Sequence, residues 1–169
     1  FKGVPVFYSP YLSFPIDNRR ISGFLAPELG YTQRAGFSIS TPYYWNIAPN
    51  YDATLTPRYL MERGALMAGK FRYLTEQSQG KVGVEVMPYD SQTNTTRYLG
   101  SIKNSSQITP NIYSNVDLNY VSDRTYFSEL GNALSFANFN YLRSYADIDY
   151  NVYPGVSFKN MVENYQATN

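Results

Sequence analysis

Two acidic residues near the end of the chain have the spacing best suited to chemistry. Asp147 and Asp149 are separated by one residue in a segment of alternating polarity, so both carboxylates lie on one face of a predicted strand. Paired carboxylates can bind a cation or divide the roles of general acid and base. A simpler interpretation, two solvated residues beside Arg143, is favoured because no ligand motif accompanies them. We therefore expect no metal site.

Other catalytic groups are missing from the composition. The chain contains no cysteine and no histidine, which removes the usual general base, the common nucleophile pairs and any disulfide. Neither a G-x-S-x-G motif nor a P-loop is present. The sequence therefore predicts a protein that is not an enzyme and that needs no cofactor.

Two prolines have a spacing that affects strand pairing. If the first hairpin turns about Pro49, Pro42 and Pro57 lie at nearly the same height on adjacent strands. Each proline removes a donor from the hydrogen-bond ladder and fixes φ. In a closed barrel the outer edge of the first strand must pair with the last strand, so Pro42 would mark a weak seam. Alternatively both prolines only terminate short strands, and spacing alone does not decide.

The elements that must position these residues are strands. Between residues 35 and 165, segments of about ten residues alternate polar and apolar side chains, and turn residues separate them. Strands of about 9–11 residues are long enough to cross a bilayer at a tilt. We predict an all-β fold of antiparallel meander strands, about eight of them after residue 30. The alternation alone does not decide whether their apolar faces meet the lipid around a large outer-membrane β-barrel or a protein core. No stretch shows a helical periodicity of useful length.

Alternation gives each strand one apolar and one polar face. In a transmembrane barrel the apolar face meets lipid and the polar face lines the lumen. The candidates for lumen-facing residues are Asp52, Thr54, Arg58, Lys70, Arg72, Glu85, Asn115, Asp117, Asn119, Arg143, Asp147 and Asp149.

Composition agrees with a barrel and argues against two other classes. The net charge is +1 and no basic face is clustered, so nucleic acid is not an expected partner. No apolar run approaches the roughly 18 residues of a transmembrane helix. The 18 tyrosines suit the aromatic girdles of a barrel, although tyrosine is also a good strand residue in general.

Two regions depart from the strand pattern. Residues 1–30 contain four prolines and predict an extended stretch, followed over residues 16–30 by a linker between two modules. The first residue is not methionine, so we expect the chain to be a piece of a longer protein. Residues 122–140 form the longest interruption, and their aromatic residues indicate a loop that packs: Tyr126, Phe127, Phe136 and Phe139.

Several motifs closely resemble the LptD family, the lipopolysaccharide-assembly proteins of Gram-negative outer membranes. The match is strong from about residue 4 to 127, and beyond that only the strand pattern supports it. The stretches that carry it are Val4-Pro5-Val6-Phe7-Tyr8-Ser9-Pro10-Tyr11-Leu12, Arg19-Arg20-Ile21-Ser22-Gly23-Phe24-Leu25, Pro42-Tyr43-Tyr44-Trp45-Asn46-Ile47-Ala48-Pro49-Asn50, Thr56-Pro57-Arg58-Tyr59, Phe71-Arg72-Tyr73-Leu74, and Val121-Ser122-Asp123 leading to Tyr126-Phe127.

The resemblance implies an architecture and a role. Residues 1–30 would be the end of a periplasmic β-jellyroll and the connector, and residues 31–169 the first strands of a barrel of about twenty-six strands. Lipopolysaccharide would arrive from the periplasmic bridge protein LptA and leave through a seam between the first and last strands into the outer-membrane lipids. The lipoprotein LptE would plug the lumen. Pro42 and Pro57 match the family's gate prolines by position, and with Tyr44 they are our lateral-gate candidates.

Two other classes of function stay open. One is a general outer-membrane porin that has no gate and no dedicated substrate. The other is a soluble β-sandwich, such as a carbohydrate-binding module that uses tyrosines as sugar platforms.

Overall fold

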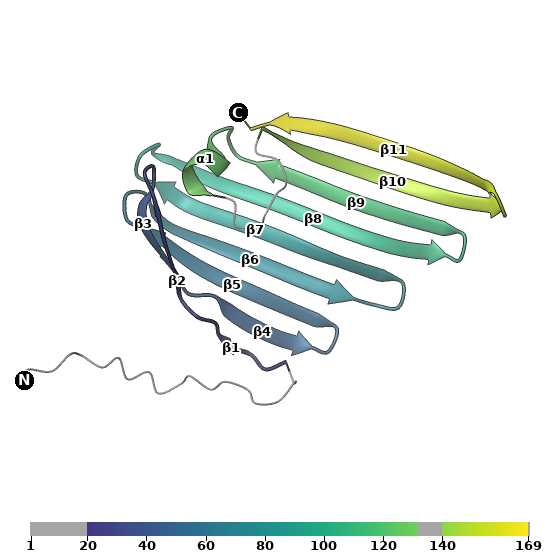
Figure 1. The fold of residues 1–169 in the computed structure, drawn as a ribbon, viewed down its shortest axis with the longest axis horizontal. Helices are drawn as coiled ribbons and strands as arrows, with labels where there is room; N and C mark the ends of the chain where they lie inside the picture. Colours follow the sequence, from purple (N-terminus) through teal and green to yellow (C-terminus); the bar gives the residue numbers. More distant parts are fainter. Residues whose placement is uncertain (1–19, 132–139, 169) are drawn as a thin grey trace, which may run out of the picture.

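The computed structural model describes residues 20–131 and 140–168, so most of the expected jellyroll segment, Phe136 and Phe139 lie outside the described residues. The described chain forms β-strands and one short helix (Figure 1). The elements are β1 (Gly23–Phe24), β2 (Glu28–Thr32), β3 (Gly36–Ser40), β4 (Tyr43–Ala48), β5 (Tyr51–Leu60), β6 (Gly64–Leu74), β7 (Ser78–Asp90), β8 (Thr95–Thr109), β9 (Ile112–Val121), α1 (Tyr126–Leu130), β10 (Tyr141–Tyr153) and β11 (Val156–Ala167).

All eleven strands belong to one antiparallel sheet, and from β4 to β11 the neighbours follow chain order. Both β3 and β4 pair with β5, and their register is continuous from Ser40 opposite Arg58 to Tyr43 opposite Leu55. They are therefore one strand, interrupted at Thr41 and Pro42. This first strand and the seven that follow confirm the all-β meander predicted from the sequence.

The outer edge of this first strand is already paired, which the sequence did not predict. β1 pairs with β4 and β2 pairs with β3, so the expectation of a plain linker over residues 16–30 is wrong for its described part. The backbone donors and acceptors of an exposed edge favour pairing with a nearby extended segment. Together β1 and β2 form an added edge strand along β3 and β4. Three residues separate β1 from β2, but only two separate β3 from β4, so the added edge strand has a one-residue bulge.

One turn lies elsewhere than the residue types indicate. The serines and the proline of residues 105–110 predict a turn there, but β8 continues through Thr109, and the turn is at residues 110–111. Ser105 pairs with Gln79 on one side and Asn115 on the other. Serine and asparagine are typical of turns, but here they lie on the polar side of a paired strand.

The sheet has one apolar and one polar face. On the apolar face, large side chains from neighbouring strands stand directly opposite one another and are partly or largely exposed. One row on this apolar face runs through Trp45, Ala53, Phe71, Val82, Ile102 and Leu118. No described helix has the length and apolarity needed to span a membrane.

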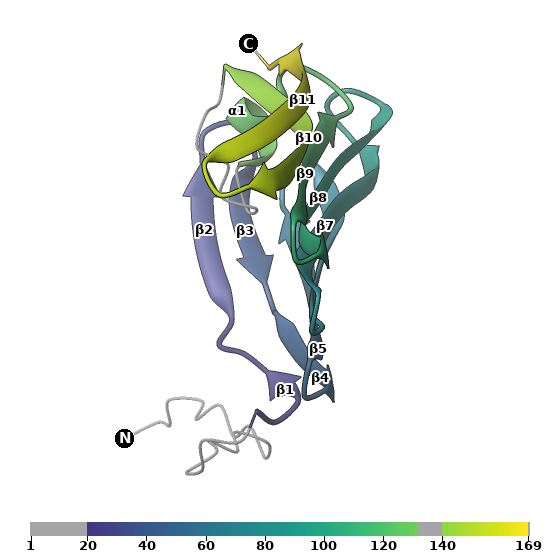
Figure 2. The ribbon, with the colours of Figure 1, turned by 90° about the vertical axis from the view of Figure 1, so that its right-hand side faces the viewer.

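The buried apolar residues gather at one end of the opposite face, around α1. Figure 2 shows the sheet curving so that α1 lies on its concave side. Tyr126 and Phe127 are buried there, which confirms the prediction of a loop that packs. Side chains from six strands, the β2–β3 turn and the end of α1 complete this core: Ala35, Leu60, Leu66, Ala68, Met87, Leu99, Val121, Leu130 and Leu142.

Gly80 allows a close contact between three strands, and it supplies a test of the fold. A Cβ there would lie 2.5 Å from Oη of Tyr73 and 2.6 Å from the carbonyl oxygen of Lys103. We expect Gly80→Ala to lower the free energy of unfolding by about 1–3 kcal/mol, because backbone cannot move aside cheaply. Urea unfolding of the full-length protein in detergent measures this. Gly100→Ala is the control, with nothing within 4 Å of its Cβ, and equal effects would contradict the packing.

Candidate functional site

The two gate-candidate prolines lie side by side at the edge of the sheet. The amide of Thr41 donates to the carbonyl of Pro57 over 3.2 Å, and Pro57 has no N–H to return the bond. On the other side, the amide of Leu25 donates to the carbonyl of Pro42 over 2.8 Å, and again no bond returns. Pro57 therefore weakens the pairing of the first two long strands, and Pro42 weakens the outer edge itself.

Tyr44 points to the concave face next to these prolines. Its hydroxyl donates to Oδ2 of Asp52 over 3.2 Å. Asp52 also accepts two bonds of 2.7 Å from Arg72, a bidentate pair, and lies 3.4 Å from Arg20. The carboxylate is buried, while both arginines are largely exposed. Asp52 thus fixes two arginines beside the edge strand.

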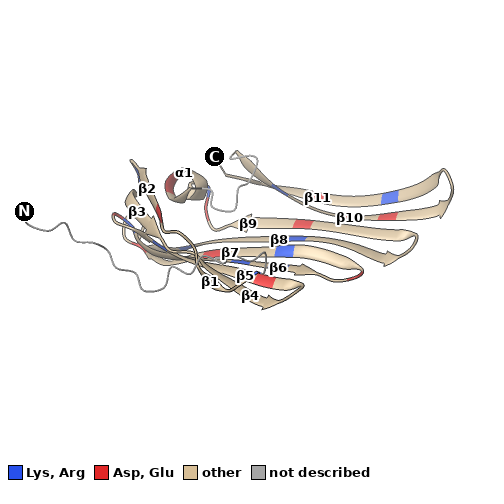
Figure 3. Cartoon of the chain, turned by 60° about the horizontal axis from the view of Figure 1, so that its bottom comes forward, with Lys and Arg blue, Asp and Glu red and all other residues tan. Residues whose placement is uncertain are grey.

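From Asp52 a row of polar side chains crosses the sheet. Its members face one another directly across the strand pairs, one per strand from β5 to β10. Figure 3 shows acidic and basic residues lying along the strands in this part of the sheet. The row consists of Asp52, Arg72, Lys81, Lys103, Asp117 and Tyr145.

The paired aspartates of β10 are part of an ion cluster. Lys159 on β11 lies 3.3 Å from Asp147 and 3.6 Å from Asp149, and Asn115 donates to Asp147 over 3.2 Å. Asp147 is buried, and Arg143 pairs with Glu163 instead. The expectation of a solvated residue is therefore wrong for Asp147, while Asp149 is partly exposed, and both carboxylates pair with Lys159 of β11 rather than with Arg143. Among described residues, no group of acidic side chains could hold a metal ion.

The structure places the twelve lumen candidates on one face. Cross-strand partners share a face, and the register joins Asp52 to Arg72 and Thr54 to Lys70. On the far strands it joins Asn115 to Asp147. Two of the twelve contact α1 instead: the buried Glu85 accepts a bond from Tyr126, and Arg58 donates to the carbonyl of Leu130 over 2.8 Å. That this face lines a lumen stays a prediction.

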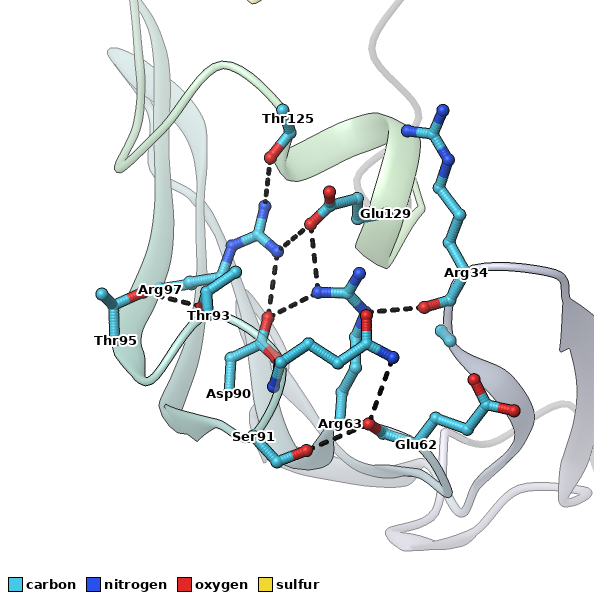
Figure 4. Close-up of polar contacts among 12 residues, drawn as sticks. Arg34, Glu62, Arg63, Asp90, Ser91, Thr93, Thr95, Arg97, Thr125 and Glu129 are labelled. Atoms are coloured by element: carbon cyan, nitrogen blue, oxygen red, sulfur yellow. Dashed lines mark hydrogen bonds and ion pairs between the residues drawn. The ribbon is translucent and has the colours of Figure 1, made fainter.

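Sequence reasoning missed a network of buried charges under α1. Asp90 is fully buried between Arg63 and Arg97, at 2.7 and 3.0 Å. Both arginines are also buried and reach Glu129 of α1, at 3.0 and 2.6 Å (Figure 4). Arg97 further holds Asp123 through two bonds of 2.9 and 2.6 Å. Ion pairs thus attach the helix to the sheet.

Two further contacts hold the same loop. Burial raises the pKa of Asp123, but hydrogen bonds from Arg97 and Ser122 outweigh it and keep that pKa below its usual range. The stabilisation that the charged Asp123 gives the fold is therefore present at neutral pH and is lost only as the pH falls through the lowered pKa. Tyr126 donates to Oε2 of Glu85 over 2.8 Å, and the other oxygen of that buried carboxylate has no hydrogen-bond partner.

An up-and-down antiparallel sheet with a charged concave face and an exposed apolar face is the wall of a transmembrane β-barrel. Sequence comparison then gives the family. A sequence model described as "LptD protein" matches residues 1–109, and one described as "LPS transport system D" matches residues 95–169. The chain belongs to the LptD family.

Several curated relatives carry the name LPS-assembly protein LptD. That of Aromatoleum aromaticum is 49% identical over 138 residues, which cover 82% of this chain and 18% of the relative. That of Nitrosococcus oceani is 49% identical over 145 residues, 86% of this chain and 20% of the relative. That of Azoarcus sp. is 41% identical over 169 residues, 100% of this chain and 21% of the relative. The chain thus spans about a fifth of these relatives.

Proposed function

We propose that this chain is the first part of an outer-membrane barrel that inserts lipopolysaccharide into the outer leaflet. The saccharide would pass along the concave face, and the acyl chains would leave through a lateral gate at the first strand. Polar sugars avoid hydrocarbon by this route, and acyl chains avoid water. Membership of the LptD family supports the transport role, and it also makes an enzymatic role unnecessary.

The observation that carries the gate is the pair of missing donors at Pro42 and Pro57. One loss falls on the outer edge of the first strand and the other on its inner edge, and the two are one residue apart along that strand. Two strands joined by fewer hydrogen bonds need less free energy to separate. Tyr44, fixed by Asp52, would line the opening on the concave side.

The remaining parts of the proposal follow the family. Residues 1–30 would lie on the periplasmic side, as the end of a jellyroll that receives lipopolysaccharide from the bridge protein LptA. The lipoprotein LptE would fill much of the lumen. Outer-membrane lipids would cover the apolar face, whose side chains include Trp45 and Leu55 at 49% and 43% exposure.

A photo-crosslinking residue at Tyr44 of the full-length protein in cells tests the proposal. We expect a lipopolysaccharide adduct that disappears when export is blocked upstream. The same residue at Leu55, on the apolar face of the neighbouring strand, is the control and should not give an export-dependent adduct. A folded barrel without an adduct at Tyr44 would argue that the substrate leaves elsewhere, and a general porin would give none.

A further inference from the structure

Three cations stand next to one another in the centre of the concave row. Arg72 on β6 faces Lys81 on β7, and Lys81 faces Lys103 on β8. Residues directly opposite on neighbouring strands have Cβ atoms about 4.5–5.5 Å apart, and like charges there are destabilising. The arrangement therefore costs stability in the protein alone.

Neighbouring acids neutralise only the two ends of this triplet. Arg72 is bound by Asp52 through two bonds of 2.7 Å, and Lys103 lies 3.0 Å from Asp117. The central Lys81 is exposed and forms no ion pair within the described residues. It carries the charge that a bound anion would neutralise.

The surroundings of Lys81 suit an oxyanion. The three cations border a hollow of about 410 Å³, which Gln79, Ser105 and Tyr145 also line. Side-chain amides and hydroxyls donate to phosphate or carboxylate oxygens, and lysine and arginine supply the charge. A hollow of this size accommodates a charged sugar group.

We propose that Arg72, Lys81 and Lys103 form a binding site for an oxyanion, a phosphate or a carboxylate, on the head group of the transported glycolipid. This inference rests on the proposed function. Lys81 lies three strands from β4, about 15 Å across the sheet at the usual strand spacing. The site would therefore hold the polar head group on the concave face while the acyl chains pass the edge strand.

Crosslinking at Gln79 of the full-length protein, with purified lipopolysaccharide as the probe, tests the site. We expect the double change Lys81→Gln and Lys103→Gln to reduce the Gln79 adduct about tenfold, as expected when charge-assisted bonds are lost. Lys159→Gln is the control for the loss of a lysine charge outside the site, because Lys159 lies on the same face three strands from Lys103. Dephosphorylated lipopolysaccharide distinguishes the sources: a phosphate site loses its lysine dependence, and a carboxylate site keeps it.

The Tyr44 adduct separates the two ways of failing. If Tyr44 gives an adduct and the Gln79 adduct is unchanged in the double variant, the oxyanion site is overturned and the transport role stands. If neither position gives an adduct in the unmodified protein, the proposed function is overturned as well. A second measurement needs no ligand: Lys81→Gln alone should raise the melting temperature by relieving repulsion, and a lower value would overturn the charge argument.

Discussion

Replacing Arg97 with glutamine is expected to lower the free energy of unfolding by about 3–5 kcal/mol, the usual cost of removing one partner from a buried ion pair. Arg97 is 1% exposed and contacts three carboxylates, those of Asp90, Asp123 and Glu129. Its loss leaves the fully buried Asp90 with Arg63 as its remaining cation. The α1 segment also loses one of the two ion pairs of Glu129 and keeps the other, with Arg63.

The change is measured on the full-length protein by urea unfolding in detergent and by the yield of folded barrel in cells. Arg143→Gln is the matched control, because that arginine pairs with Glu163 while both side chains are about 40% exposed. Such a pair contributes about 0–1 kcal/mol. Similar losses for the two variants would show that burial of the Arg97 network does not govern its contribution.

Replacing both gate-candidate prolines with valine is expected to abolish most lipopolysaccharide export while the barrel still folds. Valine at position 57 would supply an N–H for the carbonyl of Thr41, and valine at position 42 would supply one for the carbonyl of Leu25. The two new bonds would strengthen the pairing of the first strand with both of its neighbours, and valine also favours strands. The seam would then open too rarely for transport.

Export is followed by the amount of newly made lipopolysaccharide that reaches the cell surface. Pro88→Val is the control, since Pro88 also lies within a strand, β7, but far from the edge. Normal export in the double variant would refute the gate and leave the prolines as strand punctuation. Loss of export in the control would point to a general sensitivity of the barrel to such changes.

Much of the sheet could be predicted from the sequence because alternation determines both strand and face. Asp52 and Arg72 were placed on one face by parity alone, and the structure pairs them directly. The interruption at Pro42 was also visible, because proline removes a ladder donor wherever it occurs. These are local properties that a strand carries regardless of its neighbours.

The charge clusters could not be predicted because they depend on distant parts of the chain. Arg63 lies in the turn between β5 and β6, whereas Arg97 lies in β8, and only folding brings both to Asp90. The pairing of Lys81 with Lys103 can be predicted only when the hairpin register is known. That register depends on the loop lengths, and the misplaced turn at residues 105–110 shows that the sequence pattern did not determine them. The signal available for the network was two arginines near strand ends, which is common on any surface.

The added edge strand has a kinetic consequence. Only three residues, 33–35, join β2 to β3, so a detached β2 stays near its partner at an effective concentration of about millimolar or more. It competes with any other strand for the same edge and returns quickly after each separation. A one-residue bulge separates the pairing of β1 with β4 from the pairing of β2 with β3. An opening between β2 and β3 would therefore be brief, because the tethered β2 closes it again.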